Sequence, residues 1–212
     1  MIVLLKLNFL GKHVKDNLAI YIVVSLSFLI GISIGAFTVN ELNIHQEKDL
    51  ISYLRGFFRF LGNSGANNFD VFKQSFVDNT QMMLLIYFLG ISVIGAPLIL
   101  IILLLEGFTL GFTIGFLAKE LSGFGILISV FSVLPHAIIT VVVLTTASIF
   151  ALNFTIGIVQ KKRNKSKNYK FLNQLLTYSF IQAGLTCILV IASIIEAFIS
   201  PVFMMLILRF MN

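Results

Sequence analysis

The sequence predicts an all-α membrane protein, a polytopic helix bundle with about five transmembrane helices. Of its 212 residues, 58% are hydrophobic and 11% are charged. The mean hydropathy is +1.01, and water-soluble domains rarely combine such values. We therefore expect one integral membrane domain over residues 1–212. The net charge of +6 fits orientation in a membrane, because the positive residues flank apolar runs, and we expect no nucleic-acid partner.

The N-terminal segment 1–17 carries three lysines ahead of an apolar run from Leu18 to Val39. We expect 1–17 to be a cytoplasmic interfacial segment, either a short amphipathic helix on the lipid surface or a plain basic flank. The apolar run is too long for the core of a signal peptide, so it is predicted to be an uncleaved first crossing. Within it, Gly31 and Gly35 form a GxxxG helix-packing motif.

Segment 40–81 is the longest polar stretch, and it has no positive excess, as expected for an extracytoplasmic segment. Apolar side chains at helical spacing predict two short amphipathic helices separated by the turn NSGANN. Their apolar faces would lie in the lipid interface, against the bundle or against a partner protein, and a plain surface hairpin is the alternative. The candidate partner-facing residues are Leu54, Phe57, Phe58, Phe72 and Phe76.

A stripe of glycines follows the next apolar run. Gly107, Gly111 and Gly115 are four residues apart, so on a helix they share one face, where a partner backbone can approach closely. This pattern predicts tight helix packing, either within the chain or between two copies in a homodimer.

The remaining crossings are predicted at 82–105, 107–134, 136–159 and 171–199. Pro97 is expected to bend the first of these. The second contains charged residues and glycines, so we expect broken or half-length helices between Gly107 and Pro135, with Pro135 starting the next helix. The loop 160–171 is strongly basic and is predicted to be cytoplasmic, on the same side as the N-terminus.

Few polar groups interrupt the apolar runs. Glu106 and Glu196 could pair as a proton or substrate relay, although both fall near the ends of predicted spans, which favours a structural role. His136 is expected to cap the helix break or hydrogen-bond there rather than to act as a pH switch. A polar stripe in the last run should face the bundle interior; it comprises Gln174, Tyr178, Gln182 and Thr186, roughly continued by Ser193 and Glu196.

No group of residues suggests catalysis. The three histidines are scattered, Cys187 is the single cysteine, and no nucleophile or phosphate-binding motif occurs. We expect neither enzymatic activity nor a metal or cofactor.

Several short motifs occur in a characteristic order: Asn79, Gly90, Gly95-Ala96-Pro97, Glu106-Gly107 with Leu110-Gly111, and Leu134-Pro135-His136. Together they resemble the stage II sporulation protein M family of integral membrane proteins, and the likeness extends over most of the chain. Many relatives have Gly after the histidine and Glu a few residues later, where this chain has Ala137 and Thr140. The family-motif and polar-core residues are thus Asn79, Pro97, Glu106, Pro135, His136 and Gln182.

The resemblance implies a non-enzymatic membrane anchor in the complex that degrades septal peptidoglycan during engulfment of the forespore. In that family, the membrane protein localises two cell-wall hydrolases, the stage II sporulation proteins D and P. The expected location is therefore the cell membrane at the sporulation septum. The alternative is a permease or channel subunit, in which the bend at Pro135 and the polar stripe with Gln182 line a path.

Overall fold

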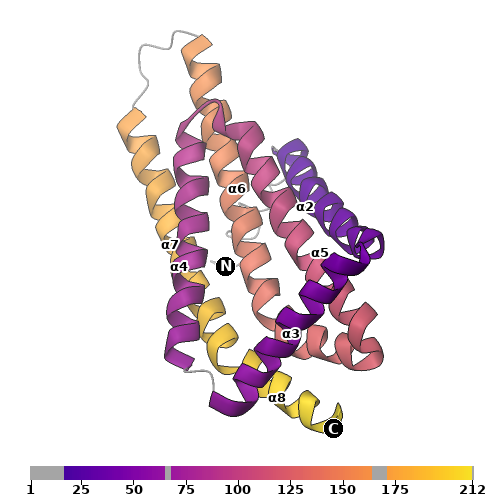
Figure 1. Cartoon of the computed structure of the whole chain (residues 1–212). Coiled ribbons are helices and arrows are strands. Elements are labelled where there is room, and N and C mark those ends of the chain that lie inside the picture. Colours follow the sequence, from indigo (N-terminus) through magenta and orange to yellow (C-terminus); the bar gives the residue numbers. More distant parts are fainter. Residues whose placement is uncertain (1–16, 65–67, 164–170, 212) are drawn as a thin grey trace, which may run out of the picture.

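The fold is seen in a computed structural model that describes residues 17–64, 68–163 and 171–211 (Figure 1). Within these ranges the chain is helical and contains no strand, so the predicted all-α fold is confirmed. Residues 1–16 and most of the basic loop 160–171 lie outside the described residues. The long helices are α2 (Leu18–Thr38), α3 (Ile44–Ser64), α4 (Asn68–Ile91), α5 (Gly95–Ile128), α6 (Leu134–Arg163), α7 (Phe171–Phe198) and α8 (Ser200–Met211). Two short turns complete them, the 3₁₀ turn η1 (Val39–Glu41) and the π-helical turn η2 (Ser129–Val133).

Three stretches of the described chain are long and apolar enough to span a membrane: Leu18–Glu41, Gly95–Gln160 and Phe171–Met204. The second contains both α5 and α6, so these stretches hold α2, α5, α6 and α7. The more polar α4 runs beside them in the bundle (Figure 1). Its first half carries charged residues, which is why it lies outside the apolar stretches.

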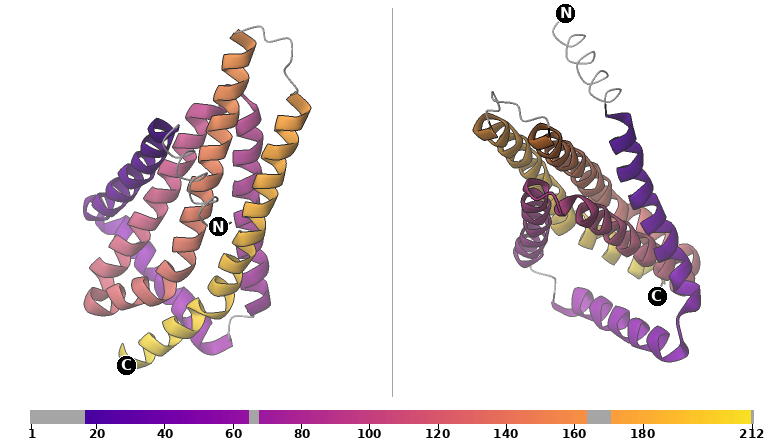
Figure 2. Two further views of the ribbon diagram at one scale, coloured as in Figure 1. Left: turned by 180° about the vertical axis from the view of Figure 1, so that it is seen from behind. Right: turned by 90° about the horizontal axis from the view of Figure 1, so that it is seen from above.

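The five long helices of the bundle run side by side, while α3 and α8 cross one end of it (Figures 1 and 2). The opposite end carries the turn between α4 and α5 and the ends of α6 and α7 at Arg163 and Phe171. If the basic loop is cytoplasmic, as its charge predicts, α3 and α8 lie outside the cytoplasm. We refer to their side of the molecule as the α3 end.

The break near Pro97 differs from the prediction. The chain turns at 92–94, where the Ser92 amide donates to Leu89 O and the Gly95 amide donates to Ser92 O, each at 3.0 Å. Pro97 then lies in the first turn of α5, where its missing amide costs no helical hydrogen bond. The predicted crossings 82–105 and 107–134 are therefore wrong in their boundaries, because α5 continues through Gly107 without interruption.

The predicted surface segment 40–81 is also too long. Residues 68–91 form the single helix α4, because neither Pro nor Gly interrupts them before Gly90. The second predicted amphipathic helix is thus the first half of a bundle helix. Only the part around α3 crosses the end of the molecule (Figure 2).

The predicted interruption between Gly107 and Pro135 is present. Ser122 has a non-helical backbone conformation with a positive φ of 51° and ψ −128°, which ends the straight part of α5. After this kink, Gly125 packs so closely on the Leu117 carbonyl that a Cβ atom would clash with it. Pro135 is the second residue of α6, as expected for a proline that starts a helix. The half-length helix is therefore the short piece between Ser122 and η2.

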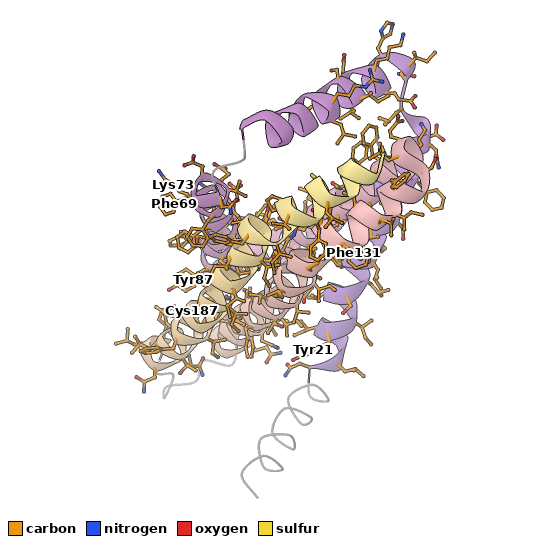
Figure 3. The ribbon with its side chains drawn as sticks, turned by 90° about the horizontal axis from the view of Figure 1, so that it is seen from below. Tyr21, Phe69, Lys73, Tyr87, Phe131 and Cys187 are labelled. Carbon is orange, nitrogen blue, oxygen red and sulfur yellow. The ribbon has the colours of Figure 1, made fainter. Side chains whose placement is uncertain are left out.

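Helix α8 is held against η2 at the α3 end. The Ser132 hydroxyl donates to Ser200 O at 2.9 Å, and the Ser200 hydroxyl donates to Ser132 O at 2.6 Å. Figure 3 shows Phe131 beside α8, where its ring stacks on that of Phe203 with 5.7 Å between centroids. The predicted end of α7 before Pro201 is thus confirmed, and α8 is part of the packed structure.

The glycine stripes of α2 and α5 interlock. A Cβ atom on Gly31 would clash with Leu104 O, and one on Gly107 would clash with Phe28 O. Contacts at Gly35 and Gly111 repeat this pattern one turn further along, so the two helices run parallel with their backbones in contact. Gly115 is looser, since its nearest neighbour would be 3.3 Å from an added Cβ atom. The stripe therefore packs within the chain.

We expect Gly111→Ala to destabilise the protein by roughly 1–3 kcal/mol, because the added methyl group meets the backbone of Ile32, which cannot move aside as a side chain can. Thermal unfolding in detergent measures the effect. The matched control is Gly184→Ala on α7, where an added Cβ atom meets nothing within 4 Å and the change should be neutral or slightly stabilising. Equal unfolding temperatures for both variants would contradict the interlocked packing.

Helix α3 is attached to the bundle by one side. Lys119 Nζ lies 3.1 Å from Glu47 Oε1 and donates to Val39 O at 3.3 Å. Further along α3, Leu54 packs against the buried pair Leu117 and Ile128. Leu54 was predicted to face a partner, but its side chain is directed at the bundle. The side chains of Phe57 and Phe58 lie outside the described part of the structure.

We expect the contact between α3 and α5 to weaken in acid. The hydrogen bond from Lys119 lowers the pKa of Glu47 below its ordinary value, so this interaction stabilises the folded state at neutral pH and is lost as the pH falls through the lowered pKa. The protection of α3 amides from hydrogen exchange, corrected for the intrinsic exchange rate at each pH, should therefore be lower at pH about 3 than at pH about 7, on either side of the carboxyl range. Glu47→Gln should reduce this difference and Glu41→Gln should not; identical pH responses in both variants would contradict this role.

Candidate functional site: a polar cavity in the bundle

A partly open cavity of about 560 Å³ lies between the bundle helices. Its lining comes from α2, α4, α5, α6 and α7, and it occupies the half of the bundle nearer the α3 end, since it is lined by the first half of α4, the start of α6 and the end of α7. Its polar lining residues are Ser75, Asp78, Asn79, Gln81, Glu106, Thr109, His136, Thr140, Thr145 and Glu196. Polar groups inside a membrane bundle are costly and mark candidate functional sites.

One side of the cavity is a chain of hydrogen bonds between α4 and α7. The Ser75 hydroxyl donates to Glu196 Oε2 at 2.6 Å, and the Asn79 amide nitrogen donates to the Ser193 hydroxyl at 3.1 Å. A longer contact of 3.4 Å joins Asn79 to Ser75. These bonds fix the two helices in register and hold the Glu196 carboxyl at the cavity wall.

The other side of the cavity carries groups without partners. Glu106 has no hydrogen bond or ion pair among the described residues. His136 Nδ1 and Thr140 Oγ1 also have no hydrogen-bond partner there, but these two atoms are buried behind the cavity surface. The prediction placed Glu106 near the end of a span. Because α5 starts at Gly95, Glu106 instead lies well inside a continuous helix, facing the cavity.

The structure therefore brings together three of the residues singled out in the sequence, Asn79, Glu106 and His136. It also shows the Glu106 and Glu196 carboxyls in one cavity, as the relay hypothesis required. Ser75 and Thr140 were not predicted as site residues, whereas Ser193 was expected to face the bundle interior and is buried there. Ser75 could have been found, because it precedes Asn79 by one helical turn and so shares its face.

Gln182 belongs to a separate polar cluster between α4, α6 and α7. Its amide nitrogen donates to Ala147 O at 3.1 Å and to the Tyr178 hydroxyl at 3.2 Å. The Tyr178 hydroxyl donates in turn to Tyr87 O at 3.1 Å. Tyr178 and Gln182 face the interior as predicted, whereas Gln174 is exposed.

This second cluster is tightly packed. The Tyr178 ring stacks on Phe154 and on Tyr87, with centroid distances of 4.6 and 5.2 Å. A Cβ atom on Gly90 would clash with the Tyr178 hydroxyl, so only glycine fits there. Tyr178 and Gln182 do not line the polar cavity. The two sets of polar groups therefore do not form one path.

The described residues contain no group of three or more His, Cys, Asp or Glu side chains that could hold a metal ion. Ser75, the serine that touches a cavity carboxylate, is hydrogen-bonded to Glu196 and has no histidine partner among the described residues. The geometry can bind polar groups and exchange protons at carboxylates, but the described part offers no arrangement for nucleophilic catalysis.

The fold and this cavity define a class: a polytopic helical membrane protein with a polar site inside its bundle. A comparison with protein families identifies the particular family, since the model for stage II sporulation protein M matches residues 24–201. The chain belongs to this family, which makes it a sporulation membrane protein. Comparisons with curated proteins and with solved structures found no match. Ala137 and Thr140 both line the cavity.

We expect Tyr178→Phe to destabilise the protein by roughly 0.5–2 kcal/mol, because it removes the hydroxyl that links Gln182 to Tyr87 while keeping the stacked ring. Unfolding of the purified protein in detergent measures this change. Tyr53→Phe is the matched control, since Tyr53 is 78% exposed on α3. A loss of stability equal to that of the control would show that the second cluster contributes nothing measurable.

Proposed function

We propose that the protein is a non-enzymatic membrane anchor of the septal peptidoglycan-degrading complex, which localises the stage II sporulation proteins D and P during engulfment. Membership of the stage II sporulation protein M family is the observation that carries this proposal. The proposed location is the sporulation septum, with the N-terminus in the cytoplasm and the α3 end facing the hydrolases.

The exposed side of α3 supports an anchoring role. Its other side is attached to α5 through Glu47 and Leu54, so α3 is positioned by the bundle. Ile44 and Tyr53 lie nine residues apart in α3, on opposite edges of this exposed side, with 70% and 78% of their surfaces exposed. At the start of α4, Phe69 is 66% exposed near the same end (Figure 3). Large exposed apolar side chains outside the spanning stretches are typical of partner-binding surfaces.

The alternative of a permease or channel subunit receives support from the polar cavity, because transporters place polar groups at interrupted helices within the membrane. The cavity, however, does not include the Tyr178 and Gln182 cluster that was predicted to line a path. We therefore favour the anchor.

Deleting the gene in a spore-forming host tests the role directly. We expect cells halted with a flat or bulging, unthinned septum in electron micrographs, because the hydrolases would not be retained there. Normal engulfment would contradict the anchor and direct attention to transport. The alternative predicts that changing cavity residues such as Glu106 abolishes transport activity while hydrolase recovery stays intact.

A pull-down tests the surface. The double variant Ile44→Ala and Tyr53→Ala should reduce co-purification of the two hydrolases by about tenfold or more, as expected when central interface residues are truncated. Phe180→Ala is the matched control, because Phe180 is an equally exposed aromatic residue (77%) on the membrane-spanning helix α7. Recovery equal to the wild type in the double variant would exclude the exposed side of α3 as the docking surface.

A further inference from the structure

Helix α8 is apolar on every side although it lies at the end of the bundle. Residues 202–208 include no polar or charged side chain, so no rotation of the helix about its axis would give it a polar face toward water. Within the described structure, Val202 and Leu206 are 54% and 50% exposed. A helix that is apolar all round is normally buried in a protein core or in a membrane. The exposed side of α8 therefore needs an apolar environment.

The segment 123–133, between the kink at Ser122 and α6, extends the same apolar surface. It contains no charged residue, and its Phe131 ring stacks on the Phe203 ring of α8. Both rings are partly exposed, and so is Leu127, about one helical turn before Phe131. Figure 3 shows Phe131 beside α8. We call Leu127, Phe131, Val202, Phe203 and Leu206 the outer apolar patch.

The lengths of the bundle helices give the depth of this patch in the bilayer. The Thr155 hydroxyl of α6 donates to Gly90 O, next to the turn between α4 and α5. From Thr155 back to Leu134, α6 rises roughly 32 Å at 1.5 Å per residue. A hydrocarbon core of about 30 Å that begins at this turn therefore ends at η2. The paired hydrogen bonds between Ser132 and Ser200 hold the start of α8 at the same level.

The lipid-facing surface of α7 leads directly into the patch. Ile191, Ile194 and Phe198 are exposed at helical spacing, and Val202 follows Phe198 by one turn. Backbone hydrogen bonds continue across the junction, where the Ile199 amide donates to Ile195 O and the Phe203 amide donates to Ile199 O. Segment 123–133 and residues 200–204 also fall within the stretches that are apolar enough to span a membrane. The patch is thus continuous with a surface that lipid covers.

We infer that the outer apolar patch is a lipid-contact surface, which lies in the interfacial layer of the leaflet at the α3 end and inserts its side chains among the acyl chains. Helix α8 and segment 123–133 then form an in-plane membrane element. The exposed side of α3 differs in chemistry, because Lys48, Asp49 and Arg55 are exposed on it with Tyr53. It faces water. The inference does not rest on the anchoring role.

Single tryptophans test the position of the patch, because the chain contains no Trp. Phe203→Trp and Phe131→Trp each keep an aromatic ring in the stacked pair, so they probe the patch independently from α8 and η2. Each full-length variant is reconstituted in phosphatidylglycerol vesicles with or without lipid brominated on its acyl chains. Both variants should lose fluorescence in brominated lipid, more with bromine near the headgroup than near the chain end. Iodide on both sides of the membrane should quench them little.

Two control variants calibrate the measurement. Ile191→Trp lies roughly 14 Å along the helix from Ser200, near the middle of the core, and should be quenched most by bromine near the chain end. Tyr53→Trp on α3 should be quenched by iodide and not by brominated lipid. Iodide quenching of both patch variants equal to that of Tyr53→Trp would overturn the inference, because the patch would then face water. Protection of both patch variants from both quenchers would also overturn it, because a second copy of the chain would then cover the patch.

Discussion

The backbone contact between α2 and α5 is the constraint on which the rest of the structure depends. Gly31 and Gly107 allow the two helices to touch along one face, and this contact holds them parallel. Because parallel neighbours cannot be joined by a tight turn, the chain crosses the end of the bundle as α3 and returns as α4. Helices α4 and α5 then diverge from their common turn at 92–94 (Figure 1). The polar cavity occupies the space between them.

The polar side chains inside the bundle are of two kinds, which differ in whether they have hydrogen-bond partners. The Tyr178 ring is stacked between two other rings, and Tyr178 and Gln182 both donate to helix carbonyls, so they hold α4, α6 and α7 together. Glu106 lines open volume and has no hydrogen bond or ion pair among the described residues. A packed polar network stabilises one arrangement, whereas a group facing open volume is available to a ligand. This difference separates the polar side chains that stabilise the helix packing from a polar side chain that a ligand could reach.

Composition and spacing predicted the class, the all-α bundle, the glycine stripes and the break before Pro135, because these depend on local chemistry. Helix boundaries near Pro97 were wrong, since proline is compatible with the first turn of a helix as well as with a bend. Segment 68–81 was misassigned because its charged residues resemble a surface helix, and only tertiary packing shows that Ser75 is buried. The convergence of Asn79, Glu106 and His136 required knowing which faces meet, and neither periodicity nor composition contains that information.

The parallel pairing of α2 and α5 also bears on how the protein is made. Membrane helices are delivered to the bilayer in the order of synthesis, so α2 arrives while its partner is still unsynthesised, and α3 and α4 must follow before α5 appears. During that interval, the face of α2 that carries Gly31 has no partner helix from the same chain. A chain arrested before Gly95 would therefore present an unoccupied helix-packing surface, available to any foreign membrane helix with small residues at matching positions. Incorrect pairing of α2 with a helix of another protein is therefore a greater risk during synthesis than after the bundle has formed.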